Sequence, residues 1–371
     1  MMMWNRAMGL VLVACWMGAC TEVPSARGQH GDGGTGSWDA GSGGPGDPVC
    51  QTGSATAEGQ VVDGDGSGMA HVQVDVGGCT AMSDGAGYYT LANIPVAVRQ
   101  HINFRLSGYF PLSYALTIKA GSTNYVEATM VASTYHKVTG SGEAIHNDLA
   151  EVPGGHYLDR AGRSYTRPVV VDTDYLEPSV AMAKHYFPGT TDGKDKAGKA
   201  VQFVSYGVVA VHAWSDDKTT ILRNSGGMAI TFPMNADATE ATLSLFFYDE
   251  QQGIWTEKGE AQRQADGSYA SQVSRVGSWS LSKAVRVPPG IYKGRIVYEN
   301  KEPAQDIRVF AVGKNWLAEA LSTDSDGRFE LHVVPDAEFK LEAYDCTKKY
   351  AAAYADPIPG IASGEIVDDR T

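Results

Sequence analysis

The sequence has few of the features on which nucleic-acid binding or membrane spanning depends. Its 30 Lys and Arg are outnumbered by 43 Asp and Glu, which gives a net charge of −13 at pH 7. Nucleic acids and anionic lipid head groups attract clustered Lys and Arg, so we expect no nucleic-acid partner and no electrostatic attraction to membranes. No apolar run approaches the roughly 20 residues of a membrane-spanning helix.

The motifs of hydrolytic enzymes are also missing. A zinc protease needs two His on one helical face with a Glu as base, and a metallocarboxypeptidase needs His followed three residues later by Glu. Neither spacing occurs, and the nearest match is His156 followed by Asp159. A Gly-x-Ser-x-Gly elbow is absent as well. We therefore expect no enzyme, no catalytic residue and no cofactor, although a role as a subunit of a larger enzyme stays open.

A complete calcium loop is missing too. Residues 63–68 place Asp63, Asp65 and Ser67 at the first, third and fifth positions of such a loop and Gly68 at the sixth. The twelfth position, where a bidentate Glu is required, is Val74. Incomplete loops of this kind are usually Asp-Gly turns, so we predict no metal site.

Glycine, by contrast, is abundant. The 43 glycines punctuate turns between short runs rich in Val, Thr, Tyr and Ile, a pattern that favours an all-β architecture. A chain of 371 residues has room for two or three such domains.

The first 20 residues have the pattern of a secretory signal. A single Arg6 precedes a short apolar run, and small residues then lead to cysteine. This resembles the lipoprotein signal peptides of bacteria, in which the cysteine becomes the first mature residue and carries acyl chains. Cys15 and Cys20 compete for this role, and we predict Cys20 because it leaves an apolar core of usual length. The resemblance implies export to the bacterial cell envelope and an outer-membrane lipid anchor, while plain secretion with cleavage near Ala19 stays open.

The segment that follows, residues 21–49, contains almost nothing that a fold could bury. Its Gly-rich repeats predict a disordered tether. A flexible chain of this length spans roughly 30 Å, which is enough to separate a folded body from lipid head groups.

Cysteine usage agrees with export. Cys50 and Cys79 flank the first predicted strands after the tether, and we predict a disulfide between them. Closing a loop of about 30 residues in this way contributes roughly 3 kcal/mol in the chain-entropy model. Cys346 has no partner in this interpretation, and we expect it at a buried strand end.

Two stretches 240 positions apart share one pattern. Residues 83–95 and 323–335 both read Asp-x-x-Gly-x-aromatic-x-Leu-x-x-Ile/Val-Pro. The Asp can accept hydrogen bonds from backbone N–H groups two residues later, and the Gly tolerates positive φ. The aromatic residue and the Leu, Tyr89 and Leu91 in the first copy, point to one face of a strand that the Pro ends. The chain therefore carries one turn-and-strand module twice.

The surroundings of the two copies show a family resemblance. In residues 50–131 the module follows the alternating valines of residues 72–76, and a further strand closes the segment. This order resembles the carboxypeptidase regulatory-like domain, a transthyretin-like β-sandwich of secreted bacterial proteins, although Met69-Ala70 stands where the family often has Pro. Residues 288–371 repeat the plan with a longer loop. The resemblance implies two small sandwiches, and no peptidase activity carries over.

The larger region between them, residues 132–287, is similar to the β-rich module of cartilage intermediate layer proteins. The similarity is carried by the strand and Asp-Glu pair of residues 243–250, the Gly253 turn and Trp255. Turn chemistry alone predicts a hairpin at Gly253. We expect Trp255 and Trp279 to be core residues.

These observations predict an all-β string of three sandwich modules. The expected parts are a signal peptide (1–20), a tether (21–49), a first regulatory-like sandwich (50–131), a central β-rich domain (132–287) and a second regulatory-like sandwich (288–371).

Two functions fit this organisation. The first is a non-enzymatic envelope lipoprotein that acts as a surface spacer, an adhesin or a partner-binding protein. The alternative is carbohydrate binding, with a surface glycan as partner, suggested by fold analogy with starch-binding-like domains. Sugar sites need exposed aromatic platforms, and the candidates are Tyr88, Tyr109, Trp214 and Trp316, each of which is also a candidate core residue.

Overall fold

The computed structural model describes residues 53–159, 161–183, 186–250, 252–320, 323–345, 350–354 and 357–369. The regular structure of these residues is strands β1 to β28 and a short helix, α1 (Pro178–Ala183), which confirms the predicted all-β class. In this part of the chain, no helix has the length and apolarity to cross a membrane. The predicted signal peptide and tether lie outside the described residues, as do Cys20, Cys50 and Cys346.

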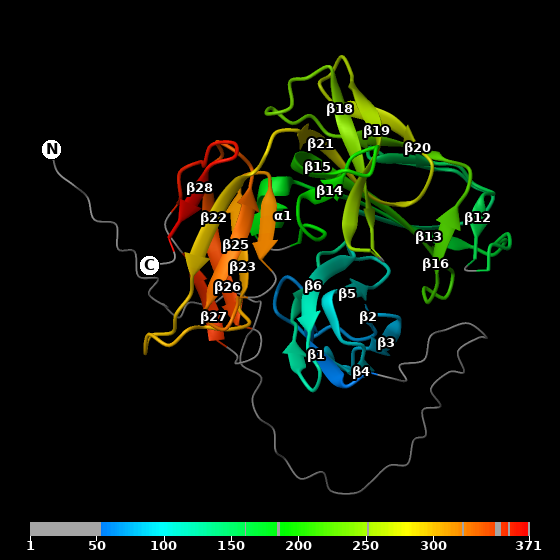
Figure 1. Ribbon diagram of the computed structural model, residues 1–371. Helices are drawn as coiled ribbons and strands as arrows, with labels where there is room; N and C mark the ends of the chain where they lie inside the picture. The colour runs from blue at the N-terminus through cyan, green and yellow to red at the C-terminus, as the bar shows by residue number, and fades with distance from the viewer. Residues whose placement is uncertain are drawn as a thin grey trace, which may run out of the picture.

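Figure 1 shows the strands in three groups, which we call the first, central and third units. The first unit contains β1 to β8 in blue and cyan, the central unit contains β9 to β21 and α1 mostly in green and yellow, and the third unit contains β22 to β28 in orange and red. The three units pack around a common centre. Domain boundaries at residues 50, 132 and 288 stay predictions.

The first unit is a sandwich of two sheets. Its strands are β1 (Ala55–Val62), β2 (Gln73–Val76), β3 (Cys79–Met82), β4 (Tyr88–Ile94), β5 (Ala97–Arg105), β6 (Leu112–Ile118), β7 (Thr123–Tyr125) and β8 (Ala128–Thr129). One sheet has the order β4-β1-β7, with β8 also paired to β1, and the other has the order β3-β2-β5-β6. Alternate side chains of both sheets are buried between them, including the predicted Val74 and Val76 at 0% exposure.

The repeated turn has the predicted geometry in both copies. Asp84 Oδ1 accepts hydrogen bonds from the N–H groups two and four residues later, both at 2.9 Å. Asp324 Oδ1 does the same at 2.9 and 2.7 Å. Gly87 and Gly327 have φ of 85° and 75°, and a Cβ on Gly87 would lie 2.2 Å from the carbonyl oxygen of Val61. The glycine is therefore required both for its φ and for the close approach of a neighbouring strand.

The third unit repeats the topology of the first. Its strands are β22 (Gly290–Arg295), β23 (Arg308–Gly313), β24 (Leu317–Ala320), β25 (Arg328–Val333), β26 (Phe339–Asp345), β27 (Tyr350–Tyr354) and β28 (Ile366–Asp368). The sheet orders are β25-β22-β28 and β24-β23-β26-β27. In both units a late strand runs parallel to the first one, β7 beside β1 and β28 beside β22. The prediction that one module occurs twice is confirmed at the level of strand order.

The central unit is one curled sheet. Its strands are β9 (Tyr135–Thr139), β10 (Ile145–His146), β11 (Ala150–Val152), β12 (Tyr157–Leu158), β13 (Val169–Leu176), β14 (Asp192–Lys194), β15 (Ala200–Ser215), β16 (Ile221–Asn224), β17 (Met228–Phe232), β18 (Thr242–Asp249), β19 (Ile254–Arg263), β20 (Tyr269–Val273) and β21 (Gly277–Val285). The main order is β10-β11-β17-β20-β19-β18-β21-β15-β13-β9. Strands near both ends, such as β11 and β13, contribute to one core, so the sheet must fold over on itself.

Two predictions for the central unit are confirmed. Strands β18 and β19 form the expected hairpin, in which Asp249 pairs with Ile254. Trp255 and Trp279 are core residues, 0% and 3% exposed.

Two glycines of the first unit test the explanation of the repeated turn. Gly87 and Gly66 have nearly the same φ, 85° and 82°, but a Cβ on Gly66 would meet nothing within 4 Å. We expect Gly66→Ala to cost about 1 kcal/mol from backbone strain alone. Gly87→Ala should cost at least twice as much, because the strand at Val61 must also move. Urea unfolding followed by tryptophan fluorescence measures both, and equal losses would refute the close-approach argument.

Candidate functional site at the junction of the units

One apolar cluster joins all three units. It contains Phe104 of the first unit, Trp255 of the central unit and Phe310 of the third. Trp255 lies among aromatic rings, with centroids 5.5 Å from Phe187 and 5.0 Å from Tyr248, and its Nε1 donates to the Pro188 carbonyl at 2.9 Å. Because apolar surface of each unit is buried against the others, the units are held together by the same effect that forms their cores.

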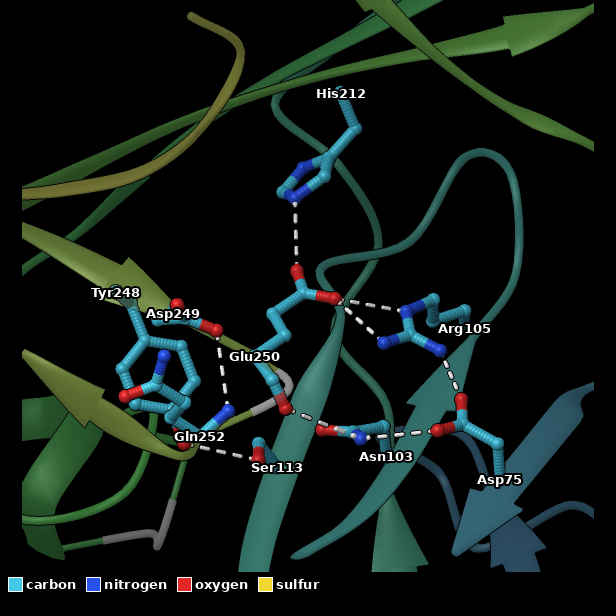
Figure 2. Close-up of polar contacts among 9 residues, drawn as sticks. All are labelled: Asp75, Asn103, Arg105, Ser113, His212, Tyr248, Asp249, Glu250 and Gln252. Atoms are coloured by element: carbon cyan, nitrogen blue, oxygen red, sulfur yellow. Dashed lines mark hydrogen bonds and ion pairs between the residues drawn. The ribbon is translucent and has the colours of Figure 1, made fainter. Parts of the chain in front are cut away.

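The turn between β18 and β19 docks on the outer face of β5. Along β5, Ile102 and Phe104 point into the first unit at 0% exposure. Side chains alternate along a strand, so His101, Asn103 and Arg105 point the other way, toward the central unit. Figure 2 shows Asn103 and Arg105 in contact with the turn at Glu250.

Arg105 forms the centre of the contact. Its Nε and Nη2 donate to Glu250 Oε2 at 2.9 and 2.6 Å, and its Nη1 donates to Asp75 Oδ2. The side chains of Arg105, Asp75 and Glu250 are 12%, 20% and 24% exposed. Burial by itself would raise the pKa of Glu250, but the Arg105 guanidinium holds this pKa well below its usual range. The network in Figure 2 therefore joins β2 and β5 of the first unit to the central unit.

Two buried histidines flank this network. His212 Nε2 lies 3.6 Å from Glu250 Oε1, beyond hydrogen-bond distance, and the ring is 4% exposed. His101 is also 4% exposed, and neither of its ring nitrogens has a hydrogen-bond partner among the residues that the structure describes. The His101 ring packs directly on Gly253, where a Cβ would come within 2.1 Å of three ring atoms. Burial, followed by the positive charges of Arg99 and Arg308, lowers the pKa of His101 to about 4.

A second polar group secures the link between the first two units. Asp172 and Asp174 on β13 are 0% and 2% exposed. Asp172 accepts a hydrogen bond from the N–H of Gly108 at 2.8 Å and lies 2.5 Å from His136 Nδ1. Asp174 accepts one at 2.8 Å from the N–H of Thr134, which lies in the segment that connects β8 to β9. Burial raises the pKa of Asp174 to about 6 in spite of this hydrogen bond.

A polar cleft of about 510 Å³ lies between the first and third units. An ion pair from Lys119 to Asp306 crosses it, and Lys293 pairs with Glu330 at 2.8 Å on its third-unit side. The full lining is Lys119, Lys293, Gln305, Asp306, Thr323, Asp324, Arg328, Phe329 and Glu330.

The four aromatic residues proposed as a ligand platform are not brought together. Tyr88 is 37% exposed on β4, and Tyr109 is partly buried against the first-unit core. Trp214 and Trp316, in the central and third units, are each 2% exposed. The platform hypothesis is therefore wrong for these two tryptophans, because neither ring is accessible to a sugar.

The Asp-Gly loop at residues 63–68 forms a turn. Asp63 Oδ1 accepts hydrogen bonds from the N–H groups of Asp65 and Ser67 at 3.0 and 2.9 Å. Across the described ranges, no group of three or more His, Cys, Asp or Glu has the arrangement of a metal site.

The structure describes only one of the two cysteines of the predicted disulfide. Cys79 begins β3 and is 3% exposed, which suits a buried bridge. Cys50 lies outside the described residues, so the pairing stays a prediction.

Sequence reasoning did not identify the junction residues. The only available signal was the alternation of His101, Asn103 and Arg105 with apolar neighbours on β5. That pattern is typical of a strand with one face in water, so it does not distinguish a docked polar face from a free one.

Comparisons with known proteins add little. No family model and no curated protein matches the chain. The major pilin subunit BcpA of Bacillus cereus aligns at 9% identity over 85% of this chain and 98% of its own, with a TM-score of 0.19. A candidate carbohydrate-binding protein of Bacteroides uniformis aligns at 9% identity over 82% and 98%, also at 0.19. The pilus protein RrgB of Streptococcus pneumoniae aligns at 8% identity over 88% and 99%, at 0.16. Structural similarities with TM-scores this low do not support an inference about the function of this chain.

The contribution of the ion network can be measured by removing its cation. Arg105→Met should destabilise the protein by about 3 kcal/mol or more, because Glu250 and Asp75 would be left as partly buried, unpaired carboxylates. The matched control is Lys196→Met, which removes an ion pair to Glu260 whose side chains are about half exposed. That change should cost under about 1 kcal/mol. Equal shifts of the two urea midpoints would contradict a structural role for Arg105.

Proposed function

We propose that this chain is an exported, non-enzymatic envelope protein that holds a rigid three-unit body at the cell surface as a spacer, adhesin or partner-binding protein. The observation that carries the proposal is the junction. One apolar cluster and the Arg105 network fix the orientation of the units, so that surfaces on different units keep constant relative positions. A rigid body of this kind suits binding or spacing.

The anchor is part of the proposal. Cys20 carries the acyl chains, and residues 21–49 separate the folded body from the outer membrane. The signal pattern and the Gly-rich composition support this arrangement.

The family assignment is also a proposal. We infer that the first and third units are carboxypeptidase regulatory-like domains and that the central unit is similar to the module of cartilage intermediate layer proteins. The shared strand order and the repeated Asp-Gly turn support the first of these assignments.

The anchor is tested by mass spectrometry of the mature N-terminus after expression in a bacterium with an outer membrane. We expect the first mature residue to be Cys20 with acyl chains attached, and the protein should leave the membrane fraction only with detergent. Cys20→Ala should abolish acylation, whereas Cys15→Ala, the matched control, should leave it unchanged. An unprocessed chain in the cytosol would contradict export, and an unmodified mature terminus near Ala19 would contradict the anchor.

The second candidate function, glycan binding, is favoured by the cleft between the first and third units. The positive charges of its two lysines and one arginine equal in number the negative charges of its three carboxylates, and Gln305 adds a neutral amide. This set of hydrogen-bond donors and acceptors suits a neutral, hydroxyl-rich ligand more than a strongly charged one.

Glycan binding is tested with the mature chain in detergent on an array of neutral and acidic polysaccharides. If the cleft binds a neutral glycan, Lys293→Ala should weaken binding at least tenfold, because the lysine lies at the cleft wall. Lys196→Ala, far from the cleft in the sequence and paired to Glu260, should bind like the unmodified protein. Absence of binding to every glycan, or equal loss in both variants, would contradict the cleft as a sugar site.

A further inference from the structure

We propose that the contact between β5 and the β18–β19 turn is an acid-sensitive latch, in which protonation of His101 releases the turn and loosens the central unit from the first. This inference concerns the junction and goes beyond the proposed surface function. It depends on the position of one imidazole among the charged groups of three units.

The pocket of His101 accommodates a neutral ring. The side chain is 4% exposed and lies against Gly253, which has a φ of 59° and leaves room for the ring only because it lacks a Cβ. Within the described part of the chain, both ring nitrogens are without hydrogen-bond partners. A protonated imidazole carries two N–H donors that each need an acceptor, so protonation adds a charge and an unsatisfied donor to a buried site.

The charges around His101 do not compensate a proton. Arg99 lies on the same strand as His101, and Arg308 lies on β23 of the third unit, where it pairs with Glu319 at 2.6 Å. Both arginines disfavour a positive ring. The carboxylates on the neighbouring elements, Glu250 on the turn and Asp75 on β2, are already bound to Arg105.

The remaining neighbours that the structure describes provide no strong acceptor either. The cross-strand neighbour on β6 is Ala115. The other carboxylate of the turn, Asp249, accepts a hydrogen bond from the N–H of Gln252 at 3.1 Å. Tyr248 OH already donates to Ser113 at 2.9 Å.

The other histidine at the junction has the opposite surroundings. His212 faces Glu250 at 3.6 Å, and its cross-strand neighbour on β13 is Asp172. His212 therefore lies beside carboxylates, whereas the charges near His101 are arginines. This asymmetry makes His101 the residue whose protonation opens the contact.

The pH range follows from the direction of the shifts. The pKa of His101 is about 4 when the turn is docked and returns toward 6.5 when the turn is released. The docked state is therefore fully favoured above about pH 6.5 and loses stability as the pH falls toward 4. Asp174, whose pKa is raised to about 6, acts in the opposite sense, because protonation removes the cost of its buried charge.

The test is amide hydrogen exchange of the full mature protein in detergent at pH 7.5 and pH 5.0, with rates corrected for the intrinsic effect of pH. We expect protection of peptides that cover β5 and the β18–β19 turn to fall about tenfold or more at pH 5.0. Peptides that cover β25 in the third unit should keep their protection. Unchanged protection at β5, or an equal loss in all units, would overturn the latch.

Variants then assign the effect to one side chain. His101→Phe keeps a flat ring that cannot be protonated, and its β5 protection should not change between the two pH values. His101→Gln provides a second neutral variant if phenylalanine does not fit beside Gly253. His332→Gln, a change of a histidine that is 57% exposed, should keep the pH response of the unmodified protein. A pH response that survives in a folded His101 variant would assign the release to another group and overturn the proposal.

Discussion

A buried guanidinium must be matched by negative charge, and one of the two carboxylates that match Arg105 reaches it only when the first and central units are docked. Asp75 belongs to the same unit as Arg105, but Glu250 comes from the central unit. If the units separated, Arg105 and Glu250 would each need to recover their hydration, and a shifted docking position would leave them buried and unpaired at a cost of several kcal/mol. Apolar burial supplies the general attraction between the units, and we infer that this ion network selects one orientation from the many that burial alone would allow.

The local structure of the two small units could be predicted because each important residue acts within its own turn or strand. The Asp of the repeated stretch binds N–H groups two and four residues later, and the Gly has the positive φ that the turn requires. The hairpin at Gly253 has the same local origin. Interactions that span a few residues leave a signature that can be read from the sequence.

The junction could not be predicted because its partners lie far apart in the chain. Arg105 and Glu250 are 145 positions apart, and the outer face of β5 has the same polar pattern as a face in water. The platform hypothesis failed at Trp214 and Trp316 for a related reason. A Trp on a strand can point into the core or out of it, and only the packing of the surrounding sheets decides which.

The same buried face explains how one junction can be rigid at neutral pH and still respond to acid. If the three units were joined by apolar side chains alone, a change of pH between 7.5 and 5.0 would alter no charge in the contact. His101 changes this because its neutral ring packs like an apolar group on Gly253, while its protonated form lies beside Arg99 and Arg308 without an acceptor. Glu250 keeps its charge over this range, since the Arg105 guanidinium lowers its pKa far below it. The orientation of the units therefore depends on Arg105 and their release depends on His101. These two residues lie on the same strand, two positions after and two positions before Asn103.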